Sequence, residues 1–142
     1  MSDIRLKQRF KNFESAFKIL ISDFDGRKIS EFSELEQGGL VQHFEVVWEL
    51  AWKVIKDYLE NDGVKISIVS PRSVIKEAAH VFFEAANIDG DIFIEMLNTR
   101  NELSHIYDSQ KFQKSLVKIQ SDYVMQLENL YLFLHSQVAQ DE

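Results

Sequence analysis

Apolar residues recur along this chain at steps of three and four, the spacing that places side chains on one face of an α-helix. The first apolar face ends at Asp25-Gly26. The next helix is expected to begin at the capping pair Ser33 and Glu36, or nearer Leu40 because Gly38-Gly39 weakens its first turn, and to end before Gly63. The two apolar faces consist of Leu6, Phe10, Phe13, Phe17, Leu20 and Phe24, and of Leu40, Phe44, Val47, Ala51, Val54 and Tyr58.

The second half of the chain continues this helical pattern after one interruption. Residues 64–69, VKISIV, alternate like a strand, but a single short strand has nothing to pair with, so an extended connection is expected. Ser70-Pro71 starts a shorter helix that reaches about Ala86, and a further helix follows a turn around Gly90. A last helix is expected from Asp108 or Ser109. Its apolar face is formed by Phe112, Leu116, Ile119, Tyr123, Leu127, Leu130 and Leu134.

These elements predict an all-α fold, an up-and-down four-helix bundle with an additional short helix, in a single domain over residues 1–142. The chain has 45% apolar residues and no cysteine, which excludes disulfides and thiolate metal sites. It shows no signal peptide and no run near the roughly 20 apolar residues of a membrane span. We therefore expect a cytoplasmic protein without a membrane partner.

The net charge of −7 argues against a general nucleic-acid binder, because affinity for phosphate comes mainly from lysine and arginine. Any contact with RNA must therefore be local. Two stretches could supply it, or could equally be solvated helix faces. They are Lys111, Lys114 and Lys118 in the last helix, and Arg5, Lys7, Arg9 and Lys11 near the start.

The second helix is apolar on nearly all sides, more than a bundle of this size normally covers. The surplus suggests a partner surface, most simply a homodimer. One narrow stripe is polar. It is either an ordinary solvated stripe with an ion pair between Glu49 and Lys53, or part of a binding site. The stripe consists of Gln42, Glu45, Glu49, Lys53 and Lys56.

The stretch TRNELSHIYD, Thr99 to Asp108, concentrates polar chemistry. If it is helical, each residue turns by about 100°, so Leu103 and Ile106 point into the bundle and a polar front faces outward. That front carries Arg100, Ser104 and Tyr107 on one line and Asn101 and His105 on the next.

An arginine binds phosphate bidentately, a histidine exchanges a proton near neutral pH, and an asparagine orients either partner. Such a set can stabilise an in-line phosphoryl transfer without a metal. No metal site and no cofactor is indicated, because a single histidine lacks nearby ligands. The alternative is a chance cluster on a solvated helix, and acidic neighbours such as Glu95 and Glu102 favour that alternative.

The pattern Arg100-Asn101-x-x-x-His105-x-Tyr107 resembles the Arg-x4-His signature of the HEPN superfamily, in the extended form of toxins paired with minimal nucleotidyltransferases. Most of the chain is similar, in order, to the branch called nucleotidyltransferase substrate-binding proteins. The segments that carry this resemblance are QRFKNFESAFKIL, GLVQHFEVVWELAWKVIKDYLENDG, SPRSVIKEA and EMLNTRNELSHIYD.

The resemblance implies a dimeric bundle in which two copies form one metal-independent ribonuclease cleft. It assigns His105 as general acid or base, Arg100 as the group that stabilises the phosphorane charge, and Asn101 as a positioning residue. Tyr107 would receive AMP from a partner nucleotidyltransferase, the antitoxin. The stripe residues Glu45, Glu49 and Lys53, with Ser104, are expected to line the same cleft.

Three functions therefore remain open. In the first hypothesis the chain is a ribonuclease toxin neutralised at Tyr107, and the intact set of motif residues favours this. In the second it is a non-catalytic subunit that binds nucleotide or another substrate for a separate nucleotidyltransferase, and the acidic charge favours that. In the third hypothesis it is a structural adaptor whose motif only builds a dimer.

Overall fold

The computed structural model describes residues 2–105 and 109–139, and it is a helical bundle. No strand occurs within these ranges. The predicted all-α bundle of four main helices and one short helix is confirmed, because α5 and α6 continue one another as a single rod. The helices are α1 (Ser2–Phe24), α2 (Glu34–Asn61), α3 (Pro71–Ala78), α4 (Gly90–Leu103), α5 (Ser109–Lys118) and α6 (Val124–Ala139).

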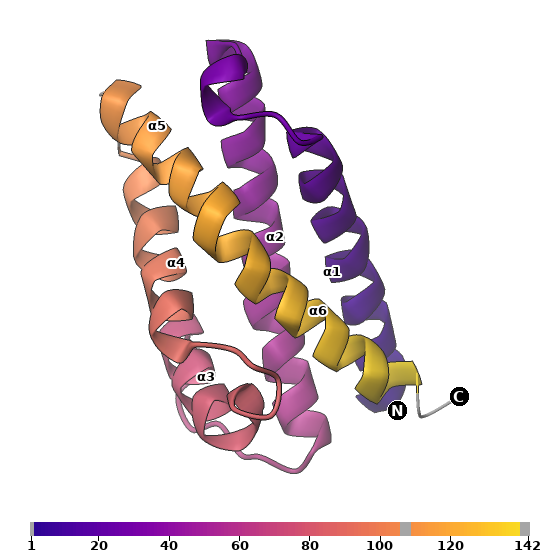
Figure 1. Cartoon of the computed structure of the whole chain (residues 1–142). Coiled ribbons are helices and arrows are strands. Elements are labelled where there is room, and N and C mark those ends of the chain that lie inside the picture. Colours follow the sequence, from indigo (N-terminus) through magenta and orange to yellow (C-terminus); the bar gives the residue numbers. More distant parts are fainter. Residues whose placement is uncertain (1, 106–108, 140–142) are drawn as a thin grey trace.

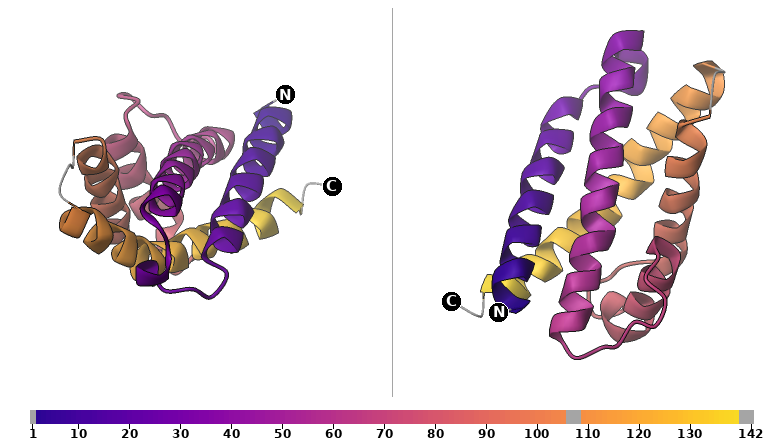
Figure 2. Two further views of the ribbon diagram at one scale, coloured as in Figure 1. Left: turned by 90° about the horizontal axis from the view of Figure 1, so that it is seen from above. Right: turned by 180° about the vertical axis from the view of Figure 1, so that it is seen from behind.

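The helices α1, α2 and α4 lie side by side in one layer, and the α5–α6 rod crosses one face of this layer diagonally (Figure 1). Seen from behind, α2 lies between α1 and α4 with its outer face turned away from the rod (Figure 2). This arrangement brings the end of α4 next to the start of α5 and leaves one face of α2 at the surface. No helix in the described part of the chain is long and apolar enough to cross a lipid bilayer.

The start of α2 is fixed by a capping box. The Ser33 hydroxyl accepts a hydrogen bond from the Glu36 N–H at 3.1 Å, and Glu36 accepts one from the Ser33 N–H at 2.9 Å. These bonds satisfy backbone donors that a helix start leaves open, so α2 begins at Glu34 and runs through Gly38-Gly39. Of the two expected starts, the earlier one is correct.

The apolar faces predicted from the sequence form the core. All six residues of the first face are buried, and so are those of the last helix apart from the half-buried Phe112. The apolar surface that α2 leaves uncovered is smaller than expected, because Trp48 and Ile55 are buried within this chain. Val46 remains 46% exposed and Leu50 half-buried on the outer face, so the homodimer stays a prediction.

Two connections position α4. Residues 64–69 form neither helix nor strand, as expected, and Ser70 caps α3 by accepting a hydrogen bond from the Ser73 N–H. The turn before α4 is centred earlier than predicted. Asn87 takes the left-handed conformation with φ 57°, Asp89 caps the helix, and Gly90 is already its first residue.

One polar pair in the core joins α4 to the final rod. The hydroxyls of Thr99 and Tyr123 lie 2.7 Å apart, and both side chains are buried. Tyr123 closes a π-helical segment, Ile119–Tyr123, that interrupts the rod and was not expected from the sequence. Burial raises the pKa of Tyr123, so its hydroxyl stays protonated at neutral pH and can donate to Thr99.

We predict that Thr99→Val and Tyr123→Phe each destabilise the fold by about 1–3 kcal/mol, because each leaves one buried hydroxyl without its partner. The double variant should cost clearly less than the sum, since it removes both hydroxyls together. Chemical denaturation of the four proteins measures these free energies of unfolding. If the double variant loses as much stability as the two single variants together, the hydrogen bond between Thr99 and Tyr123 does not stabilise the contact of α4 with the rod.

Candidate functional site

The motif residues lie at the carboxyl end of α4, on a helix whose orientation is fixed by burial. Met96, Thr99 and Leu103 recur at helical spacing and are buried against α2 and the rod. The residues between them must therefore point sideways or outward. Arg100 and Asn101, which are neighbours in sequence, are directed about 100° apart.

The expected continuation of the helix through Tyr107 is wrong at Ser104 and His105, which form a turn after Leu103. The Ser104 hydroxyl donates to the Asn101 carbonyl at 2.9 Å, and the His105 N–H donates to the Glu102 carbonyl at 2.8 Å. These bonds satisfy carbonyls that a helix end leaves open. Ser104 thus serves as a cap, whereas Ile106, Tyr107 and Asp108 lie outside the described residues.

Arg100 points toward α2 and meets the predicted polar stripe. Its Nη2 atom lies 3.3 Å from Oε1 of Glu49. The second oxygen of Glu49 accepts a hydrogen bond from the Trp52 indole at 3.1 Å and lies 3.7 Å from Nζ of Lys53. The expected Glu49–Lys53 ion pair is therefore present, and Glu49 also joins α2 to α4. Glu45 lies half-buried one turn earlier, with no ion pair inside the described ranges.

This Glu49 cluster retains the capacity to bind an anion. Two cations, Arg100 and Lys53, lie beside the Glu49 carboxylate, and Glu45 lies one turn earlier on the same helix. The Arg100 Nε atom is buried without a hydrogen-bond partner among the described residues, although the side chain as a whole is 35% exposed. The Arg100 guanidinium is partly exposed, and a guanidinium at the surface is suited to bind a phosphate.

Asn101 and His105 face a different direction, into a shallow groove of about 670 Å³ between the end of α4 and the start of α5. Arg100 does not line this groove. Within one chain the structure therefore separates the arginine of the motif from its histidine. The groove is lined by Asn101, Glu102, His105, Lys111, Lys114 and Ser115.

A second hollow of about 580 Å³ extends this groove along α4 and α5, because the two share Glu102, Lys114 and Ser115. At its far end Lys118 forms an ion pair with Glu95, and this hydrogen-bonded contact raises the pKa of Lys118. Lys118 is thus neutralised by a neighbour. Neither Lys111 nor Lys114 has an ion-pair partner within the part of the chain that the structure describes.

From the sequence, Lys111 and Lys114 were expected only as part of a possible basic helix face, and Trp52 was not predicted to belong to the site. For Lys111 and Lys114 the available signal was that they follow the motif and are three positions apart, on one face of a helix. No local sequence pattern predicts a role for Trp52. Its indole belongs to the site because it donates a hydrogen bond to Glu49. In the described ranges no group of three histidine, aspartate or glutamate side chains is placed to hold a metal.

Comparison with protein families gives one match over most of the chain. The family model described as nucleotidyltransferase substrate binding protein like matches residues 8–136. The match confirms the resemblance seen in the sequence and includes α2, α4 and the groove between α4 and α5. A comparison with curated proteins finds no significant match.

We predict that Glu49→Gln changes the free energy of unfolding by less than about 1 kcal/mol, because partly exposed ion pairs contribute little and the amide oxygen can still accept from Trp52. Glu49→Ala should cost about 1–2 kcal/mol more, since the indole and guanidinium both lose an acceptor. Chemical denaturation compares the two variants with the wild type. Equal stability of the alanine and glutamine variants would contradict a bridging role for Glu49.

Proposed function

Because the chain belongs to the nucleotidyltransferase substrate binding protein like family, we propose that it is the partner of a separate minimal nucleotidyltransferase. We further propose that it is a metal-independent ribonuclease toxin, which that partner neutralises by AMP transfer to Tyr107. The observation that supports catalysis is the position of His105, in an open groove next to Lys111 and Lys114, which have no ion-pair partner among the described residues of this acidic protein.

In this mechanism the ribose 2′-hydroxyl of RNA attacks its own phosphate. His105 takes the hydroxyl proton as the bond from the 2′-oxygen to phosphorus forms. The bond from phosphorus to the 5′-oxygen breaks, and a second His105, from another copy, gives that oxygen a proton. The products are a 2′,3′-cyclic phosphate and a 5′-hydroxyl, and Asn101 positions the phosphate or the imidazole.

Arg100 stabilises the negative charge that develops on the phosphorane. Arg100 points to α2 and His105 points to α5, so we propose that a dimer brings a guanidinium and an imidazole from different copies to one phosphate. The exposed Val46 and half-buried Leu50, on the outer face of α2 next to the Glu49 cluster, support such a dimer surface. A phosphate at Arg100 would compete with Glu49 for the same guanidinium.

Neutralisation would act at the same place. The Tyr107 oxygen attacks the α-phosphorus of ATP on the partner enzyme, and pyrophosphate leaves. The product carries a bulky anion only two residues from His105, where it would fill the groove and attract its cations. This step uses chemistry supplied by the nucleotidyltransferase, and the present chain supplies only the hydroxyl.

A non-catalytic subunit that binds a nucleotide or other substrate is the second candidate. Two observations favour it: the net charge of −7 and the ion pair through which Glu49 holds Arg100. In that function Arg100 and His105 bind phosphate without bond cleavage. A purely structural adaptor is the weakest candidate, since it requires no imidazole beside two lysines in one groove.

We predict that the purified chain cleaves single-stranded RNA in the presence of excess chelator and leaves cyclic phosphate ends. His105→Ala should lower the rate by about 10²–10⁴-fold and Arg100→Ala by about 10²–10³-fold. Gel analysis with mapping of product ends measures both. If a folded, unmodified dimer leaves the RNA intact, the ribonuclease proposal fails and the binding subunit is favoured.

We predict that the partner nucleotidyltransferase and ATP add the mass of one AMP to the wild-type chain, and that Tyr107→Phe abolishes this addition. Tyr58→Phe is the matched control, because Tyr58 is half-buried near the carboxyl end of α2, where its ring packs against Phe82. Intact-protein mass spectrometry gives the readout. Unchanged labelling of Tyr107→Phe would assign the modification to another residue.

A further inference from the structure

Most cations near the motif are compensated by a carboxylate. Lys53 and Arg100 share Glu49, and Lys118 is paired with Glu95. Lys111 and Lys114 differ, since both are exposed and neither forms an ion pair inside the described ranges. The protein has a net charge of −7, yet this groove contains two lysines without an ion pair to any described residue, so the charge here differs in sign from that of the whole chain.

The two lysines are placed to act together on one anionic strand. They lie three residues apart on α5, about 4.5 Å along the helix axis, and both line the groove that contains His105. The remaining lining residues offer an amide from Asn101 and a hydroxyl from Ser115, with one opposing carboxylate from Glu102. Ammonium, amide and hydroxyl groups are the donors that contact a sugar–phosphate backbone.

The shape of the groove favours a strand over a single phosphate group. The first hollow contains Lys111 and Lys114, and the second continues past Lys114 to Lys118. Lys111 and Lys118 are seven positions apart, which corresponds to about 10 Å along the helix axis. A continuous track of this length beside an imidazole can hold more than one phosphate.

We propose that Lys111 and Lys114 bind the phosphate backbone of a single-stranded RNA and thereby hold one of its linkages next to His105. The inference rests on the proposed function, which it deepens by naming the residues that position the substrate. Lys111 and Lys114 are positioning residues, because they act through the backbone and not on the reacting atoms. The site is distinct from the Glu49 cluster, which faces α2.

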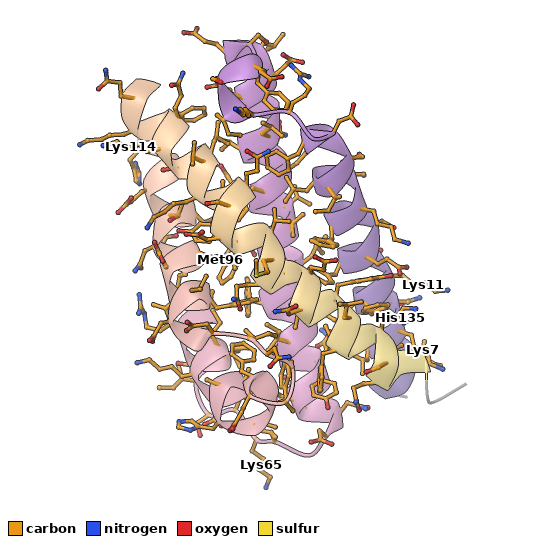
Figure 3. The ribbon with its side chains drawn as sticks, in the orientation of Figure 1. Lys7, Lys11, Lys65, Met96, Lys114 and His135 are labelled. Atoms are coloured by element: carbon orange, nitrogen blue, oxygen red, sulfur yellow. The ribbon has the colours of Figure 1, made fainter. Side chains whose placement is uncertain are left out.

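The chain contains a matched control for the charge change. Lys7 and Lys11 lie on α1 near His135, at the other end of the molecule from Lys114 (Figure 3). They also have no ion-pair partner in the described part of the chain. Replacing either pair of lysines lowers the net charge by the same amount, so a difference between the two variants reports position and not total charge.

The test measures binding of the His105→Ala chain to a fluorescent 2′-O-methyl RNA, which lacks the attacking hydroxyl, by anisotropy at several salt concentrations. Adding Lys111→Gln and Lys114→Gln should reduce the slope of log K against log salt by about 1.4, and the affinity at 0.1 M salt by roughly 25-fold. Adding Lys7→Gln and Lys11→Gln should leave both unchanged. Circular dichroism confirms that each variant is folded.

Three results would overturn the inference. They are an unchanged slope in the Lys111 and Lys114 variant, an equal loss in the Lys7 and Lys11 variant, and binding of ATP in place of RNA. Cleavage assays on chains with His105 intact separate this inference from the proposed function. If the chain binds RNA through the two lysines but does not cleave it, only the proposed ribonuclease activity is refuted. If cleavage is unchanged when both lysines are replaced, only the proposed role of Lys111 and Lys114 in binding RNA is refuted.

Discussion

Burial of one face of α4 determines where Arg100 and Asn101 of the motif point. Met96, Thr99 and Leu103 are held in the core, and the hydrogen bond between the hydroxyls of Thr99 and Tyr123 fixes the rotation of the helix against the final rod. Arg100 must then face α2, and Asn101 must face α5. A different rotation would bury the arginine or remove its carboxylate partner.

This acidic chain presents a group of cations at one local site. Its carboxylates are not spread evenly over the cations. Glu49 and Glu95 pair with their neighbours, while the ammonium groups of Lys111 and Lys114 at the α4–α5 groove form no ion pair with any described residue. Net charge governs long-range attraction, whereas contact with a phosphate depends on the few charges at the groove. An overall charge of −7 is therefore compatible with local binding of RNA and discourages nonspecific binding elsewhere.

Features set by neighbouring residues could be predicted from the sequence. The capping box at Ser33, the cap at Ser70 and the apolar faces depend on local spacing, and the structure contains all of them. The contact of Glu49 with Arg100 joins residues from two separate helices, so no local pattern shows it. The end of α4 at Leu103 was also missed, because Ser104 and His105 continue a helical pattern until their hydrogen bonds with the last turn close it.

NMR of the imidazole rings can show whether RNA binds at the α4–α5 groove beside His105. The chain has four histidines, at positions 43, 80, 105 and 135, and the other three serve as internal references. During titration with a 2′-O-methyl RNA, the ring signals of His105 should shift in a saturable way while those of His43, His80 and His135 stay in place. Shifts at His135 beside the α1 lysines, with His105 unchanged, would contradict the account.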